Sequence, residues 1–248
     1  MKTGFLLNDM LKNLFCSNGD TVVKPKRIIA IGDIHGELDK LNLLLDWVSP
    51  TEDDQLVFLG DYIDRGRSSC GVIERLLSFR QGFPTTIFLR GNHEQMLLDA
   101  LEEEKRNTHT DHSERKGLRL YNPSLEMFLG NGGKETLHSY GVISVEDIPE
   151  EHIDFIATTT SWWVYENFTF VHAGLEPNVP LEEQYQFTLL WARNSPPGKN
   201  GKIHVVGHTP TRDGKPRLEA GLYSLDTGAV YGRSLTACDV LTKEVWQI

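Results

Sequence analysis

The first ninety residues alternate between short apolar runs and amphipathic stretches. Buried strands are expected at residues 27–31, 56–59 and 85–89, where β-branched and other apolar side chains follow one another. Between these runs, apolar residues recur at helical spacing over 37–48 and 69–79. Strands that alternate with helices predict parallel strand pairing, with the helices packed on the sheet.

The pattern changes after residue 93. A helix ending in charged residues is expected over 94–106, and the polar stretch 107–117 has no apolar periodicity. Together with further helical pieces such as 134–140, this makes residues 95–160 a mostly helical insertion lying over the site. The last third predicts strands at 168–171, 203–206, 221–225, 229–231, 234–238 and 244–247. A single domain, residues 1–248, is expected, with the insertion at about 95–160.

Composition narrows the class of protein. The net charge of -10 argues against general electrostatic binding of nucleic acid. No apolar run approaches the length of a membrane span, and residues 1–15 fit a short amphipathic helix. The three cysteines, Cys16, Cys70 and Cys238, have no paired spacing. We therefore expect a cytoplasmic protein with reduced thiols. We expect no nucleic-acid or membrane partner.

Five short segments place polar residues beside a glycine, and those that can be judged locally follow an apolar run. They are GDIHG at 32–36, GDYIDRG at 60–66, GNHE at 91–94, HAG at 172–174 and GHT at 207–209. Taken singly, each segment is an ordinary turn. In sheets built from alternating strands and helices, however, ligands collect beyond the carboxyl ends of the strands. Five such segments in order therefore indicate one shared site.

Six residues of these segments are candidate metal ligands: Asp33, His35, Asp61, Asn92, His172 and His208. This mixture of carboxylate, imidazole and amide oxygen suits Mn, Fe, Zn or Co better than a thiolate site or a calcium cage. Six ligands are too many for one catalytic metal that keeps an open position. Two metals that share a bridging carboxylate are expected, and Asp61 is the predicted bridge.

The remaining polar residues of the segments suggest a reaction. Two metals lower the pKa of bound water towards about 7, so a bridging hydroxide is the expected nucleophile. His93 is the candidate general acid for a leaving alkoxide, and Asp64 is the candidate partner of its imidazole. The candidates for bidentate phosphate contacts are Arg65, Arg90 and Arg193.

From about residue 27 to the C-terminus, the segments GDIHG, GDYIDRG, RGNHE, HAG and GHT resemble the motifs of the phosphoprotein phosphatase family of binuclear metallophosphoesterases, in the same order. The family includes phage-lambda-type and bacterial serine/threonine phosphatases. The resemblance implies a four-layer αββα, calcineurin-like fold, in which helices flank a β-sandwich. It also implies two divalent cations, with Mn²⁺ foremost and Fe, Zn, Co or Ni as alternatives.

The resemblance further assigns roles to residues. Asp33, His35 and Asp61 correspond to the ligands of the first metal, and Asp61, Asn92, His172 and His208 to those of the second. The pair of His93 and Asp64 resembles the general acid, and Arg65, Arg90 and Arg193 resemble the phosphate-binding arginines.

The expected function is metal-dependent hydrolysis of phosphate monoesters, chiefly phosphoserine and phosphothreonine in proteins. A symmetrical bis(5'-nucleosyl)-tetraphosphatase, which acts on diadenosine tetraphosphate, shares these segments and stays an alternative. The acidic balance opposes a phosphodiesterase for nucleic acid. A non-catalytic binding protein on the same fold would be expected to have lost a ligand, and none is missing. The expected partner is thus a phosphorylated protein, a small phosphate ester or a dinucleoside polyphosphate.

Overall fold

The computed structural model describes residues 24–109 and 122–248. The amphipathic helix expected at 1–15 and most of the polar stretch 107–117 lie outside these ranges. No helix within them combines the length and the apolar character that spanning a bilayer requires.

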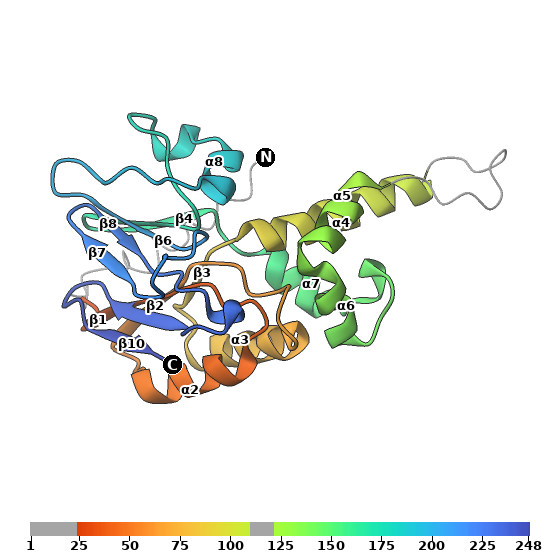
Figure 1. The fold of residues 1–248 in the computed structure, drawn as a ribbon, viewed down its shortest axis with the longest axis horizontal. Coiled ribbons are helices and arrows are strands. Elements are labelled where there is room, and N and C mark those ends of the chain that lie inside the picture. Colours follow the sequence, from red (N-terminus) through yellow and green to blue (C-terminus); the bar gives the residue numbers. More distant parts are fainter. Residues whose placement is uncertain (1–23, 110–121) are drawn as a thin grey trace, which may run out of the picture.

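Two five-stranded mixed sheets form the centre of the molecule (Figure 1). Their strand orders are β10-β9-β1-β2-β3 and β4-β5-β6-β8-β7. The strands are β1 (Arg27–Ile31), β2 (Asp54–Phe58), β3 (Ile87–Phe88), β4 (Trp162–Tyr165), β5 (Phe168–Val171), β6 (Ile203–Val206), β7 (Arg217–Glu219), β8 (Leu222–Ser224), β9 (Thr236–Asp239) and β10 (Val245–Gln247). As predicted, β1, β2 and β3 pair in parallel, whereas β9 joins β1 in the antiparallel sense.

Helices cover both outer faces of the two sheets and continue at one end. The helices are α2 (Leu38–Val48), α3 (Ser69–Gly82), α4 (Asn92–His109), α5 (Pro123–Phe128), α6 (Lys134–Tyr140), α7 (Glu150–Ala157) and α8 (Gln186–Trp191). Short helical turns are η1 (Leu129–Gly133), η2 (Val145–Asp147), η3 (Leu181–Glu183) and η4 (Ala229–Tyr231).

Side-chain alternation along β1 separates two apolar layers. Ile29 and Ile31 belong to the cluster that includes the apolar residues of α2 and α3. Ile28 and Ala30 point to the opposite face and belong to the cluster shared with the second sheet. A third cluster joins Leu189 of α8 to the second sheet. The order helix, sheet, sheet, helix confirms the four-layer αββα fold.

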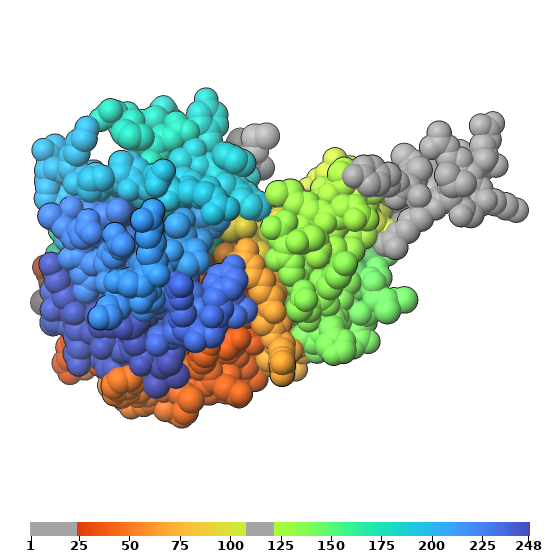
Figure 2. All heavy atoms as spheres, viewed as in Figure 1, coloured from red at the N-terminus to blue at the C-terminus, as the bar shows by residue number. Residues whose placement is uncertain are grey.

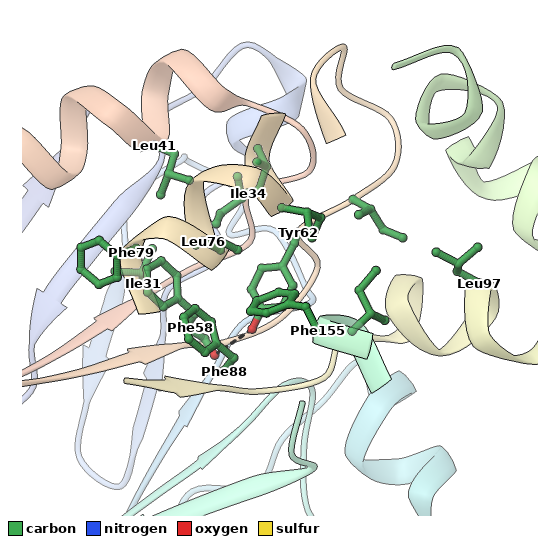
Figure 3. Close-up of a cluster of buried hydrophobic side chains, with 14 of the residues drawn as sticks. Ile31, Ile34, Leu41, Phe58, Tyr62, Leu76, Phe79, Phe88, Leu97 and Phe155 are labelled. Atoms are coloured by element: carbon green, nitrogen blue, oxygen red, sulfur yellow. Dashed lines mark hydrogen bonds between the residues drawn. The ribbon is translucent and has the colours of Figure 1, made fainter. Parts of the chain in front are cut away.

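The helices α4 to α7 gather at one end of the sandwich (Figure 1). Figure 2 shows this helical group bordering residues of the first third of the chain, so it lies beside the sandwich rather than over a sheet face. The junction is aromatic: the ring of Phe155 lies 5.1 Å from Phe88 and 6.2 Å from Tyr62 (Figure 3). The Tyr62 hydroxyl donates to the Leu89 carbonyl at 2.6 Å, which fixes the turn after β2 to the end of β3.

Three local expectations were wrong or incomplete. Residues 229–231 form a 3₁₀ turn instead of a strand, because Gly228 and Gly232 on either side have φ of 81° and 77°. The strands β4 and β7 had not been expected. The strand predicted at 85–89 is reduced to the two residues of β3.

Candidate metal centre

The parallel strands of both sheets deliver the candidate ligands to one edge. Asp33 follows β1, Asp61 follows β2, and Asn92 follows β3 at the first position of α4. In the second sheet, His172 comes directly after β5, and His208 comes two residues after β6. Since the strands within each set run parallel, their carboxyl ends meet.

The backbone at this edge adopts left-handed conformations at non-glycine residues. The φ angles are 46° at His35, 53° at Asp61, 72° at Asp64, 67° at Arg65 and 63° at His208. Such conformations cost about 1–3 kcal/mol each and persist only where surrounding contacts impose them. Their concentration among predicted site residues indicates that the fold stabilises this edge for a function.

Glu94 is one of those surrounding contacts. Its carboxylate accepts the backbone N–H groups of Asp61 at 2.9 Å, Tyr62 at 2.8 Å and Ile63 at 3.3 Å. It also accepts the N–H of Gly91 at 3.0 Å, so it joins the turns after β2 and β3. Burial raises the pKa of Glu94 to about 7, and the backbone donors oppose this shift.

Asp61 lies between two groups of donors. One carboxylate oxygen is 3.4 Å from His172 Nε2, and the other is 3.4 Å from His35 Nε2 and 4.0 Å from His93 Nε2. The groups His35–Asp61–His93 and Asp61–His172–His208 could each hold a metal ion. This two-sided position is the one that a bridging carboxylate requires.

The group around Asn92 fits a divalent cation. Asn92 Oδ1 lies 3.0 Å from His172 Nε2 and 2.9 Å from His208 Nδ1. His172 Nδ1 is 2.8 Å from the Leu59 carbonyl, which can only accept, so in the neutral ring the lone pair of Nε2 points toward Asn92. Ligands at about 2.0–2.2 Å from one metal lie roughly 3 Å apart when they are adjacent. The spacing of the donors therefore matches one shared cation.

The candidate histidine ligands differ in protonation when no cation is bound. Burial alone would lower the pKa of His172, but the charge of Asp61 and its hydrogen bond raise it to about 10. Burial lowers the pKa of His208 to about 4 and that of His35 to about 3. At neutral pH, His35 and His208 are therefore neutral, while His172 carries a proton where a cation would otherwise bind.

His35 faces the other oxygen of Asp61. Its Nδ1 donates to the Ile63 carbonyl at 2.8 Å, which places the lone pair of the neutral ring on Nε2. Arg65 Nη1 donates to this Nε2 at 2.9 Å. A metal at His35 would therefore displace the guanidinium of Arg65 from the ring.

Asp33 is joined to the end of β6. Its two carboxylate oxygens accept the His208 N–H at 3.1 and 3.0 Å. Burial, and then the charges of Asp226 and Asp61, raise the pKa of Asp33 well above its usual value. A Cβ on Gly207 would overlap the Asp33 carboxylate, so only glycine fits there. All six predicted ligands thus converge on one edge, and their binding of metal stays a prediction.

His93 and Asp64 form a buried pair, with His93 Nδ1 2.7 Å from Asp64 Oδ2. His93 Nε2 is buried and has no hydrogen-bond partner in the described part of the chain. Burial lowers the pKa of His93 to about 4 and raises that of Asp64 well above its usual value. Both shifts disfavour separated charges, so without a bound cation or substrate the ring is neutral, with its proton on Nδ1 and a lone pair on Nε2. The free Nε2 lies toward Asp61, where a general acid would be needed.

Thr136 of α6 completes this pair, and sequence reasoning missed it. Its hydroxyl donates to Asp64 Oδ1 at 2.5 Å and accepts the Asp64 N–H at 2.9 Å. Ser69 Oγ accepts the same N–H at 3.0 Å. Asp64 and Thr136 are 72 residues apart in the chain, and a threonine in a short helix gives no local signal.

Replacing Thr136 with valine is expected to lower kcat about tenfold while KM changes little. The buried Asp64 oxygen would lose its donor, which costs about 1–3 kcal/mol, and the imidazole of His93 would be held less firmly. Turnover of phenyl phosphate should fall more than that of p-nitrophenyl phosphate, because the poorer leaving group needs the proton more. Thr136→Ser is the matched control and should retain activity. Equal losses in the serine and valine variants would contradict this role.

Two of the predicted phosphate-binding arginines lie beside the candidate ligands. Arg65 reaches His35, as described above. Arg193 is exposed, and its charge is among the influences that lower the pKa of His208. They thus approach the two candidate cation sites from different sides.

Arg90 is held by other contacts. Its Nη2 donates to the Ala157 and Thr159 carbonyls at 2.7 and 3.1 Å, and its Nε donates to the Thr159 hydroxyl at 3.0 Å. Nη1 donates to Gln95 at 3.2 Å. Arg90 therefore braces the connection from α7 to β4, and its phosphate contact stays a prediction.

A four-layer sandwich with histidine and carboxylate donors at one sheet edge is the architecture of the metallophosphoesterases. The family model "Calcineurin-like phosphoesterase" matches residues 26–233. The chain belongs to this family of hydrolases, whose members use a binuclear metal centre.

Three comparisons illustrate its relationships. Serine/threonine-protein phosphatase 1 of Salmonella typhimurium is 30% identical over 227 residues, which is 85% of this chain and 90% of that protein. Serine/threonine-protein phosphatase 7 of Arabidopsis thaliana is 33% identical over 117 residues, or 46% of this chain and 28% of that one. A solved structure of a suspected diadenosine tetraphosphatase has a TM-score of 0.62 at 23% identity, and covers 90% of this chain and 95% of its own. That last similarity indicates a shared fold.

Proposed function

We propose that the protein is a phosphomonoesterase that removes phosphate from phosphoserine and phosphothreonine in proteins. The observation that carries this proposal is the unpartnered Nε2 of His93, held by Asp64 and facing Asp61. A monoester of serine or threonine has an alkoxide leaving group, which needs a proton donor at that position. The similarity to a bacterial phosphatase along nearly the whole chain supports the same substrate class.

The proposed cofactors are two divalent cations, with Mn²⁺ foremost. Asp33, His35 and Asp61 would hold one of them, and Asp61, Asn92, His172 and His208 the other. When bound, such cations supply hydroxide at neutral pH by lowering the pKa of water. The chain itself would donate a proton from His93 Nε2, for which the ring must carry a second proton that the charge of Asp64 stabilises, and would orient the phosphate through Arg65 and Arg193. The three cysteines are not spaced as disulfide pairs, which supports a location in the reducing environment of the cytoplasm.

Hydrolysis of diadenosine tetraphosphate is the second candidate. The name of the structural neighbour favours it, although at 23% identity that likeness concerns the fold. The same ligands and the same acid would act on a phosphoanhydride.

The test is a side-by-side measurement of phosphate release by manganese-loaded protein. The substrates are phosphoserine and phosphothreonine peptides, p-nitrophenyl phosphate and diadenosine tetraphosphate. We expect the highest kcat/KM with the phosphopeptides, and no turnover after chelation of the metal. Faster cleavage of diadenosine tetraphosphate would favour the second candidate. If none of these substrates is cleaved by protein that holds two metals per chain, both candidates are wrong.

A further inference from the structure

We propose that a pocket beside the candidate metal centre binds a second phosphoryl group of the same substrate. This inference rests on the proposed phosphatase function and specifies which phosphate esters the site prefers.

The pocket has a volume of about 460 Å³ and is lined by residues of β6, β7, β8 and the segment after α8. Its wall includes Ala173 and Gly207, which are the chain neighbours of the candidate ligands His172 and His208. It therefore adjoins the Asn92 side of the centre. The proposal requires that a group attached to a phosphate at the cations extend into this pocket.

Three arginines line this pocket: Arg193, Arg212 and Arg217. All three are exposed, and no residue within 24–109 or 122–248 accepts a hydrogen bond from their guanidinium groups or forms an ion pair with them. Arg90, in contrast, is held by protein acceptors. The only acidic residue in the lining is Glu219.

The charge of the chain makes this grouping informative. The net charge is -10, so most of the surface repels a polyanion. A second phosphoryl group would also be repelled by the first one at the metals, unless nearby cations compensated for it. Guanidinium groups bind phosphate through paired N–H donors, and unpaired ones have no protein acceptor to give up first. The pocket thus offers the compensation that a doubly charged substrate needs.

The test compares esters with one and with several phosphoryl groups. Peptides with one phosphoserine are measured against peptides with two, and adenosine 5'-monophosphate against adenosine 3',5'-bisphosphate, so that every scissile bond belongs to a phosphate monoester. p-Nitrophenyl phosphate serves as a probe with no second phosphate. We expect kcat/KM to be at least tenfold higher for the doubly phosphorylated peptide or the bisphosphate than for the matched substrate with one phosphoryl group.

The variants Arg212→Gln, Arg217→Gln and their combination should remove most of this preference and leave p-nitrophenyl phosphate turnover unchanged. Arg106→Gln, an exposed arginine of α4, is the matched control for the loss of one positive charge. A preference seen only with the bisphosphate identifies a nucleotide as the source of the second group, and one seen only with the peptide identifies a phosphoprotein.

Two outcomes separate the failures. Equal kcat/KM for mono- and diphosphorylated substrates, or a preference that survives in the double variant, would overturn the pocket inference. Turnover of p-nitrophenyl phosphate would still support the proposed phosphatase function in that case. Absence of turnover with every ester would instead reject the proposed function.

Discussion

The substitution Asp61→Asn is expected to reduce kcat/KM by a factor on the order of 10³ or more. The two oxygens of Asp61 face two different donor groups, so the loss of its charge affects both candidate cation sites. Asparagine keeps the size of the side chain. Its Oδ1 can still accept a hydrogen bond from the backbone N–H of His93, which lies 3.2 Å from Asp61 Oδ1. The fold is therefore expected to survive while the cations are lost.

Metal content per chain and phosphate release, measured on the same preparation, check this prediction. Asp39→Asn removes an equal charge from the exposed side of α2 and should change neither. An Asp61→Asn protein that holds two cations and keeps its activity would show that Asp61 does not bridge them.

The placement of the candidate ligands at one sheet edge could be predicted from the sequence because strands and turns are local features. The run of residues 27–31 is buried on both faces, and the observed β1 has the same bounds. The glycine-containing turns that follow β1, β2, β5 and β6 supply polar side chains at the edge where parallel strands end. Convergence of Asp33, Asp61, Asn92, His172 and His208 thus follows from the topology alone.

The contacts that position these residues could not be read in the same way. Thr136 reaches Asp64 only because α6 packs beside α3, and the packing of two helices depends on tertiary contacts rather than on a motif. The contacts of Arg90 with Gln95, Ala157 and Thr159 could not be read from the sequence either, because they depend on how α7 and the start of α4 pack beside it. Short strands are difficult to predict from the sequence for a related reason. β7 has only three residues and largely exposed side chains, so no apolar pattern marks it.

The exchange of His93 for asparagine should lower turnover in proportion to how poor the leaving group is. For phenyl phosphate or a phosphoserine peptide the expected loss is about 10²- to 10⁴-fold, the range found for general acids. For p-nitrophenyl phosphate the loss should be far smaller, because its leaving group departs without a proton. This contrast arises because the Nε2 of His93 is the buried nitrogen that faces Asp61 without a partner.

Two controls separate this effect from loss of structure. Metal content should stay at the wild-type value, because the proposed ligands on this side are Asp33, His35 and Asp61, although His93 also lies within reach of a cation there. Thr136 and Ser69 still hold Asp64 in the variant, so the thermal unfolding midpoint should fall only modestly. His138→Asn, at an exposed position of α6, should behave like the wild type. Equal losses for good and poor leaving groups would mean that His93 positions other residues and does not donate the proton.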